Sequence, residues 1–323
     1  MAGDISNMLG LLDGFSRQIK ESLSLPAGIT AKKGINKVVV AGMGGSAISG
    51  DLLAMFLDNS IPLYVVRGYT LPKFIDEKTL VFATSYSGNT EETLSVLEQA
   101  KSRGCNVIGI TSDGELAEKG IRTIKIPSGM PPRYALAYCF FPMLGVLSNS
   151  GLVKVKNEDI NELLSTLNSK RDTFKEKAKE LSGKLDGKLP VIYASSRFGP
   201  VAYRFKTQLN ENSKSPAYHH VFPELTHNEI VGYEGMDRRS YITIFIEDID
   251  DHERIQKRMV IAKDIMKRSV DIISIKTIGN SLLCRVFATI NLLDYISYYL
   301  AIRRRVDPAT NTAIDELKER MKK

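Results

Sequence analysis

Short apolar runs alternate with helix-like segments along almost the whole chain, and no other feature constrains the fold as strongly. Apolar runs of about four to eight residues bounded by turn residues are typical of buried strands. Strands that alternate with helices form parallel sheets covered by helices. The sequence therefore predicts an α/β protein, with strands in INKVVVAG (35–42), IPLYVVRG (61–68), LVFATS (80–85), CNVIGIT (105–111), TIKIP (123–127), LPVIYAS (189–195), SPAYHHVF (215–222), YITIFIED (241–248) and VDIISIKT (270–277).

The alternation is interrupted once, by a charged segment with helical periodicity at 157–185, and then restarts. Because 323 residues are more than one hydrophobic core usually organises, we expect two domains, 1–153 and 154–323, the second opening on that linker helix. Each half begins with strand, turn and helix, and each ends in a long apolar helix, at 133–147 and 282–302. We infer an internal duplication of one doubly wound unit, a parallel sheet with helices on both faces.

The composition indicates an ordinary globular protein, with 43% hydrophobic and 25% charged residues. The net charge of +7 is scattered along the chain and tryptophan is absent, so we do not expect nucleic-acid binding. Arg285 and Asp294 interrupt the apolar run 282–302, which favours a buried or interface helix over a membrane span. The expected partner is a small molecule, with neither nucleic acid nor membrane involved.

The cysteines Cys105, Cys139 and Cys284 are widely spaced and show neither a CxxC motif nor the spacing of metal ligands. An odd number of cysteines in mostly apolar segments predicts reduced core residues. The opening residues MAGDISNMLGLLDGF lack the basic region and apolar core of a signal peptide. We therefore expect a cytoplasmic protein that binds no metal and no cofactor.

The first predicted strand leads into a glycine-rich turn, VVVAGMGGSAISGD (38–51). Glycines let backbone N–H groups approach an anion closely at the start of a helix. The turn also fits the dinucleotide fingerprint as Gly42-x-Gly44-x-x-Ala47. That alternative expects an acidic residue after the next strand, where the sequence has Arg67, so only a version that binds the 2′-phosphate of NADP stays open.

Hydroxyl side chains gather after the third predicted strand, in LVFATSYSGNTEET (80–93). Ser85, Ser87 and Thr90 precede an acidic helix, and Gly88 permits a tight turn between them. In either loop taken by itself, helix capping would explain the serines and threonines. Two such loops on neighbouring parallel strands would meet outside the same edge of the sheet, where ligands bind. Together they predict a phosphate site built from hydroxyls and helix N–H groups, without lysine or metal.

These two loops, GMGGSAISGD and TSYSGNTEET, together resemble the sugar isomerase (SIS) domain, a module for phosphorylated sugars. Four further segments resemble the bifunctional phosphoglucose/phosphomannose isomerases of archaea and some bacteria: PPRYALAY (131–138), LNENSK (209–214), HHVFPELTHNEIVGYE (219–234) and DPATNTAIDELKERM (307–321). The resemblance covers nearly the whole chain and implies two tandem SIS domains with αβα architecture. It also implies a metal-independent aldose–ketose isomerase that interconverts glucose 6-phosphate, mannose 6-phosphate and fructose 6-phosphate through a cis-enediol.

The resemblance implies roles for particular residues. Glu211 would move the proton between C1 and C2, and Arg133 would stabilise the enediolate. His227 and Lys318 would open the sugar ring, with His227 supplied by the neighbouring subunit of a homodimer. The phosphate would be held by Gly44, Gly45, Ser46, Ser85, Ser87 and Thr90.

Specificity for both epimers is expected from a small hydroxyl residue near the C-terminus, either Thr310 or Thr312, which would let the enediol rotate about C2–C3. The other three histidines, His219, His220 and His252, are expected to be structural or solvated.

Two other functions stay open. The chain could be a sugar-phosphate sensor that binds without turnover, or an SIS isomerase for another phosphosugar. The simultaneous presence of an arginine, a glutamate, a histidine and a lysine at the motif positions favours catalysis.

Overall fold

A computed structural model describes residues 7–57 and 61–321, so the first six residues of the N-terminal segment discussed above lie outside the described residues. The chain forms two compact units. Gly14–Asn157 makes up the N-terminal unit, and Met1–Asp13 joins Glu158–Lys323 in the C-terminal unit. Helix α1 (Met8–Asp13) thus belongs to the C-terminal unit, where it packs on α11 (Leu282–Arg303), although it begins the described chain.

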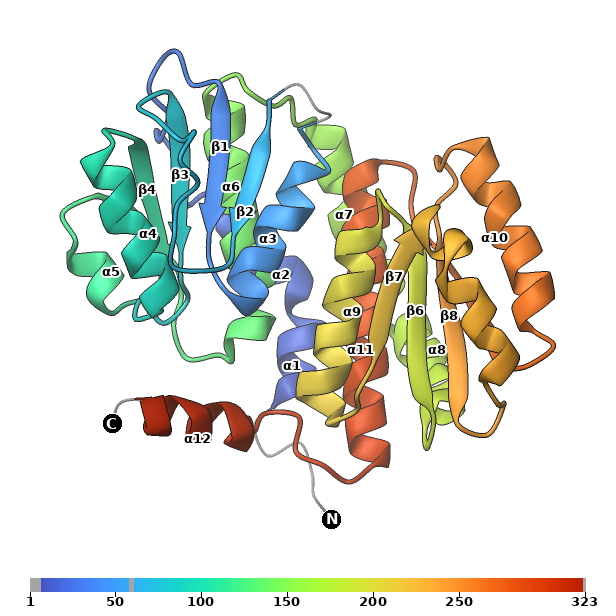
Figure 1. The fold of residues 1–323 in the computed structure, drawn as a ribbon. Helices are drawn as coiled ribbons and strands as arrows, with labels where there is room; N and C mark the ends of the chain where they lie inside the picture. The colour runs from blue at the N-terminus through green and yellow to red at the C-terminus, as the bar shows by residue number, and fades with distance from the viewer. Residues whose placement is uncertain (1–6, 58–60, 322–323) are drawn as a thin grey trace. The chain divides into compact units, whose positions relative to one another are not determined.

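The N-terminal unit is built on a five-stranded parallel sheet in the order β2-β1-β3-β4-β5 (Figure 1). Helices α3 and α6 cover one face, with α2 packed on α6, and α4 and α5 cover the other. The strands are β1 (Lys37–Ala41), β2 (Leu63–Val66), β3 (Thr79–Thr84), β4 (Asn106–Thr111) and β5 (Arg122–Lys125). The helices are α2 (Phe15–Ser22), α3 (Gly44–Ala54), α4 (Glu91–Ser102), α5 (Glu115–Glu118), the 3-10 helix η1 (Pro132–Tyr134) and α6 (Leu136–Asn149).

The C-terminal unit has a four-stranded parallel sheet in the order β7-β6-β8-β9. Helices α9 and α11 pack together on one face with α8 against α11, and α10 covers the other face with the 3-10 helix η3. The strands are β6 (Leu189–Ser195), β7 (Tyr218–Phe222), β8 (Tyr241–Glu247) and β9 (Asp271–Lys276). The helical elements besides α1 and α11 are α7 (Asn157–Ser169), α8 (Arg171–Leu185), α9 (Gly199–Ser213), η2 (Glu224–His227), η3 (Glu229–Gly235), α10 (Glu253–Met266) and α12 (Thr312–Met321).

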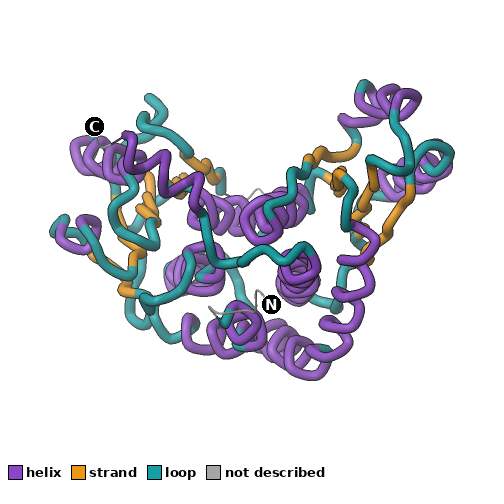
Figure 2. The backbone as a smooth tube through the Cα atoms, turned by 90° about the horizontal axis from the view of Figure 1, so that it is seen from below, coloured by secondary structure: helices purple, strands orange, loops and turns teal. Residues whose placement is uncertain are grey.

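The two units share one topology. The order β7-β6-β8-β9 repeats β2-β1-β3-β4, and β5 has no counterpart in the second sheet. In each unit, helices lie on both sides of the strands (Figure 2). Every predicted strand is present, and the predicted α/β fold with two doubly wound parallel sheets is confirmed.

Two predicted helices differ from the structure. The linker 157–185 consists of two helices, α7 and α8, which meet at Lys170. Its buried face ends at Leu167 and resumes at Phe174, because charged side chains stand where the next buried turn would fall. The helix expected at 133–147 begins only at Leu136, after the short 3-10 helix η1. Proline fixes φ and has no N–H group, so the preceding prolines suit a turn better than a helix interior.

The apolar segment expected as a buried helix forms α11, and both Arg285 and Asp294 are buried within it. Among residues 7–57 and 61–321, no helix is long and apolar enough to cross a membrane. The cysteines Cys105, Cys139 and Cys284 are buried thiols, which confirms their assignment to the core.

Helix α3 crosses the sheet closely at Gly50. A Cβ there would lie 2.8 Å from Val40 Cβ and 3.0 Å from Val65 Cγ2. We predict that Gly50→Ala lowers the free energy of unfolding by about 1–3 kcal/mol, because the close-packed interface has no room for a methyl group. The control is Gly183→Ala in α8, whose Cβ would meet the flexible guanidinium end of Arg303 at 3.2 Å. Alanine favours a helix over glycine by about 1 kcal/mol. Urea titration of both variants gives the comparison, and equal destabilisation would contradict the close crossing.

Candidate functional site

The turns after β1 and β3 lie side by side at the carboxyl edge of the N-terminal sheet. The two strands are neighbours, with Ala41 opposite Ala83, so both turns start at the same level. A Cβ on Gly42 would lie 2.9 Å from the carbonyl oxygen of Thr84. The close approach leaves no room for a larger residue at Gly42.

The first turn presents the N-terminus of α3. Met43 has extended backbone angles, and Gly44 has a φ of +50°, in the left-handed region that favours glycine. Met43 precedes the helix and does not cap it through its side chain, so main-chain N–H groups line the start of α3. Ser46 is buried in the first turn of the helix. Such a helix start favours an anion.

The second turn holds its hydroxyls in a hydrogen-bonded arrangement. Ser85 Oγ lies 2.8 Å from Thr90 Oγ1 and accepts a hydrogen bond from Gly88 N at 3.1 Å. Ser87 is exposed, and its Oγ accepts from Asn89 N at 3.3 Å. Thr90 occupies the N-cap position of α4 but makes no side-chain cap hydrogen bond, so helix capping does not explain this threonine.

Gly88 closes this turn under tight constraint. Its φ is +74°, and a Cβ would lie 1.8 Å from the carbonyl oxygen of Asp113. No side chain fits there. The turn therefore depends on glycine at this position, as the sequence suggested.

Arg133, in η1, lies beside the first of these turns. A Cβ on Gly45 would be 3.6 Å from Arg133 Cα, which places the start of η1 against the start of α3. The side chain of Arg133 is buried, with its guanidinium carbon 5.6 Å from the ring centre of Tyr134. The structure thus places seven predicted residues at one edge of the sheet: Gly44, Gly45, Ser46, Ser85, Ser87, Thr90 and Arg133.

Arg67, on which the NADP alternative depends, forms an ion pair with Asp51 of α3. Burial raises the pKa of the Asp51 carboxyl, and the adjacent guanidinium acts in the opposite direction. An arginine engaged by a carboxylate is a weaker site for a 2′-phosphate, which counts against this alternative.

Glu211 is half-buried near the end of α9 in the C-terminal unit. The helix is fixed against α11 by polar contacts on both sides of this glutamate. Before it, Arg204 pairs with Asp294 at 2.6 Å, and both side chains are almost fully buried. After it, Asn212 Nδ2 donates to Ser297 Oγ at 2.9 Å. Slipping α9 along α11 would break these contacts, so they fix the position of Glu211 along the helix.

His227 is exposed at the end of η2, in a segment anchored to the C-terminal sheet. Leu225 is fully buried, and Arg258 donates to Thr226 Oγ1 at 2.9 Å. Glu229 Oε1 accepts a hydrogen bond from the hydroxyl of Tyr193, a residue of β6, at 2.8 Å.

The hydroxyl of Tyr193 is part of a buried chain. It accepts from the Tyr233 hydroxyl at 3.0 Å, and that hydroxyl lies 2.8 Å from Thr243 Oγ1. Burial, reinforced by Tyr233 and Glu229, raises the pKa of Tyr193. The phenol therefore stays protonated and can donate to Glu229, which steadies the segment carrying His227.

The remaining predicted residues lie near the C-terminus. Thr310 is in the loop before α12, Thr312 begins that helix, and Lys318 is exposed on it. Glu211, His227 and Lys318 thus stand on three separate elements, α9, η2 and α12, whereas the predicted phosphate residues form one cluster in the N-terminal unit.

The other histidines have structural contacts. His219 lies against Tyr203 with ring centres 5.0 Å apart, and burial lowers its pKa. His220 Nδ1 accepts from the backbone N–H of Val221 at 2.7 Å. His252 is exposed, as expected, but its Nδ1 also caps α10 by accepting from Arg254 N at 3.1 Å.

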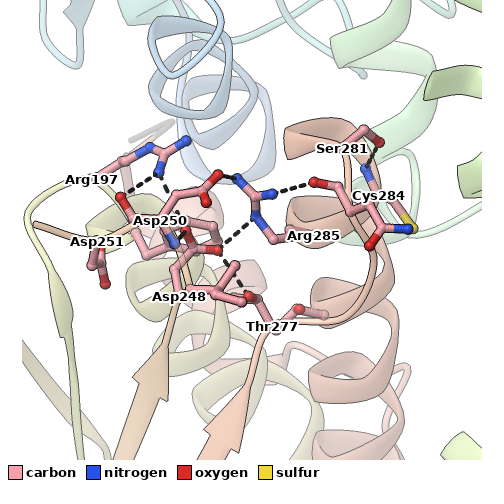
Figure 3. Close-up of polar contacts among 12 residues, drawn as sticks. Arg197, Asp248, Asp250, Asp251, Thr277, Ser281, Cys284 and Arg285 are labelled. Atoms are coloured by element: carbon pink, nitrogen blue, oxygen red, sulfur yellow. Dashed lines mark hydrogen bonds and ion pairs between the residues drawn. The ribbon is translucent and has the colours of Figure 1, made fainter. Parts of the chain in front are cut away.

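The carboxyl edge of the C-terminal sheet carries ion pairs where the N-terminal sheet carries hydroxyls (Figure 3). Asp248 directly follows β8, as Ser85 directly follows the corresponding strand β3. Its side chain is 0% exposed and pairs with Arg285 Nε at 2.9 Å and Arg197 Nη1 at 3.3 Å. Thr277 Oγ1 also donates to Asp248, at 2.8 Å. A carboxylate of the chain itself therefore engages both guanidiniums at this edge. No local sequence pattern predicted this cluster, because its members lie far apart along the chain.

Among the described residues, no group of three or more His, Cys, Asp or Glu side chains is placed to hold a metal ion.

Two units built on parallel sheets, one of them with a pair of loops suited to phosphate, are typical of SIS-domain proteins. Comparison with protein families agrees with this class. Residues 33–147 match the family described as the SIS domain. Residues 174–321 match the bacterial phospho-glucose isomerase C-terminal SIS domain. The C-terminal domain of glucosamine-fructose-6-phosphate aminotransferase from Francisella tularensis shares the fold, with a TM-score of 0.73 and 15% identity over 94% of this chain and 98% of that one.

Relatives that match over most of their length identify the family within this class. A bifunctional phosphoglucose/phosphomannose isomerase of Caldicellulosiruptor bescii is 46% identical over 304 residues, covering 89% of this chain and 90% of the relative. The protein of the same name from Aquifex aeolicus is 38% identical over 322 residues, covering 97% and 98%. This chain belongs to the bifunctional phosphoglucose/phosphomannose isomerase family.

The ion-pair cluster after β8 yields a stability prediction. Asp248→Asn removes a negative charge between two guanidiniums, one of which, Arg285, is only 5% exposed. Arg285 keeps its ion pair with Asp250 in this variant. We therefore predict a loss of about 1–3 kcal/mol in the free energy of unfolding, because the buried donors of Arg285 and Thr277 lose a charged acceptor. Asp264→Asn, which breaks the exposed pair with Lys267, is the matched control and should change stability little. Urea titrations that give equal, small losses for both variants would contradict the buried role of Asp248.

Proposed function

We propose that this chain is an isomerase that interconverts glucose 6-phosphate, mannose 6-phosphate and fructose 6-phosphate. Family membership supports both activities. The observation that carries the proposal is the meeting of the two turns after β1 and β3 with the buried Arg133. Main-chain N–H groups at two helix starts and the hydroxyls of Ser85, Ser87 and Thr90 suit a phosphate dianion.

The proposed mechanism assigns each step to a side chain. His227 and Lys318 exchange protons with the ring oxygen and the anomeric hydroxyl, which opens the sugar ring. Glu211 removes the proton from C2 of the aldose and returns it to C1, while the proton on the C2 hydroxyl moves to the C1 oxygen, so a cis-enediol lies between aldose and ketose. Arg133 provides a fixed positive charge for the enediolate oxygens.

We propose that these steps need neither a metal nor a cofactor. The charges to be stabilised are the phosphate and the enediolate, and N–H groups, hydroxyls and a guanidinium suit both. A metal would be needed only as a Lewis acid at the carbonyl oxygen, and Arg133 would supply the charge there.

Mannose 6-phosphate and glucose 6-phosphate differ only in configuration at C2. One base can serve both if the enediol rotates about C2–C3 and presents either face for protonation. We propose that Thr310 or Thr312 lines the space for this rotation. The Thr310 hydroxyl donates a hydrogen bond to the carbonyl oxygen of Asp307 at 3.2 Å, which fixes its direction.

We further propose that the protein is a cytoplasmic homodimer, in which each subunit gives His227 to the site of its partner. The three buried thiols suit a reducing compartment. The exposure of His227 on an anchored segment suits a side chain that reaches a second subunit.

Replacement of the proposed base separates an isomerase from a sugar-phosphate sensor. We predict that Glu211→Gln lowers kcat by about 10²–10⁴-fold, the usual contribution of a general base, while fructose 6-phosphate still binds. The control is Glu176→Gln, at an exposed position of α8, which should leave kcat unchanged. A discontinuous assay of the products measures kcat, and calorimetry measures the binding of fructose 6-phosphate. An undiminished kcat in Glu211→Gln would show that another group is the base.

The origin of the histidine is tested with a mixed dimer. One subunit carries Glu211→Gln and the other carries His227→Gln, and the mixed dimer is purified with two different affinity tags. If His227 acts in the partner's site, one site has both native residues and the other has neither. We then predict about half of the wild-type activity per dimer. If both residues act within one subunit, neither site is intact and the mixed dimer stays as inactive as its parents.

A further inference from the structure

Lys214 follows α9 in an unusual conformation. Its φ is 50° and its ψ is 39°, in the left-handed region that residues with a Cβ rarely adopt. The close contact of Cβ with the main chain makes this conformation strained for lysine. The LNENSK segment was singled out for Glu211, and that role does not explain why a lysine occupies the strained position after the helix.

The ammonium group of Lys214 donates to carbonyl oxygens of two segments. At the end of α9 it contacts Glu211 O at 2.9 Å and Asn212 O at 3.5 Å. In the loop before α12 it contacts Asp307 O at 2.6 Å and Thr310 O at 2.9 Å. Both segments belong to the C-terminal unit, although the loop follows more than 90 residues later.

A lysine suits this position for two reasons. The last carbonyl groups of a helix have no partner within the helix, and a cation beside them is favoured by the helix dipole. The ammonium also has three donor hydrogens, so it can serve α9 and the loop together. An apolar side chain or a carboxylate at 214 could not donate in this way.

The loop 307–310 is held together by hydrogen bonds within it. Asp307 Oδ1 accepts from Ala309 N at 2.8 Å, and the Thr310 hydroxyl donates to the carbonyl oxygen of Asp307. Pro308 is buried within it. Fixing the carbonyls of Asp307 and Thr310 therefore fixes the whole segment 307–310 and the entry to α12 at Thr312.

We propose that Lys214 is a positioning residue that clamps the segment 307–312 to the end of α9, and that this clamp sets the ratio of mannose 6-phosphate to glucose 6-phosphate formed. The main chain of Glu211 and that of Thr310 are held by one ammonium group. Lys214 thus links the main chain of the proposed base directly to that of a proposed specificity residue. The effect on the product ratio rests on the function proposed above, whereas the clamp itself does not.

The test uses two variants, Lys214→Met and Lys214→Gly. Methionine keeps the length of the side chain without its charge, and glycine accepts the left-handed backbone without strain. The control is Lys206→Met on the same helix, where the ammonium lies 5.9 Å from the ring centre of Tyr203. Hydrogen exchange of peptides from 307–321 is measured by mass spectrometry, and the products formed from fructose 6-phosphate are quantified separately.

We expect both Lys214 variants to exchange at least about tenfold faster in 307–321, as an unclamped segment opens more often, and the control to match wild type. We expect the product ratio to change by at least about twofold in the Lys214 variants and not in the control. A tenfold change in exchange corresponds to about 1.4 kcal/mol in the free energy of opening, and the twofold change in product ratio corresponds to less.

The proposal has two parts, the clamp and its effect on the product ratio, and each can be contradicted separately. Unchanged exchange in 307–321 would overturn the clamp. Faster exchange with an unchanged product ratio would overturn the link to specificity. If wild type itself forms no aldose phosphate, the proposed function and the specificity role fail together, whereas the exchange result still stands for the clamp.

Discussion

The pairing of β1 with β3 is the constraint on which the proposed phosphate site depends. Parallel neighbours in register end at the same level, so the turns that follow them meet at one edge of the sheet. Gly42 permits that meeting because a side chain there would collide with the main chain after β3. Once the turns are together, the starts of α3 and α4 follow from short connections, and Arg133 is brought beside α3 by the segment after β5. The proposed anion site is thus a product of strand order and of glycines placed where the backbone approaches most closely.

The second unit shows what the same topology becomes with different residues. Its strand order repeats that of the first, yet the residue after β8 is a buried aspartate where the residue after β3 is a serine. Arg197 and Arg285 are held by that aspartate, so the charges at this edge are used for stability. The duplicated unit instead offers Glu211, His227 and Lys318 on α9, η2 and α12. Under the proposed function, the first unit would hold the phosphate and the second would supply the groups that move protons.

Local signals in the sequence were enough to predict the fold and the two turns that meet at one edge of the N-terminal sheet. Strand periodicity, glycines in turns and hydroxyls after strands all act through neighbours in the chain, and every predicted strand is present. Features that depend on distant partners were missed. The ion pair of Asp248 with Arg285 and the contacts of Lys214 with the loop at 307–310 join residues that no local pattern relates. The helix break at Lys170 was not predicted, because helical periodicity continues on both sides of it. The adjacent residues Lys170 and Arg171, both positively charged, interrupt the buried face there. The roles of Glu211, His227 and Lys318 come from the family resemblance, since each would otherwise pass for a surface residue.

The most direct measurement is the set of products formed from fructose 6-phosphate by the purified protein in excess EDTA. The account predicts that glucose 6-phosphate and mannose 6-phosphate both accumulate, at rates that EDTA does not lower. Glucose 6-phosphate without mannose 6-phosphate would contradict dual specificity, and activity lost in EDTA and regained with a divalent metal would contradict the metal-free mechanism. Formation of neither product would contradict the isomerase itself.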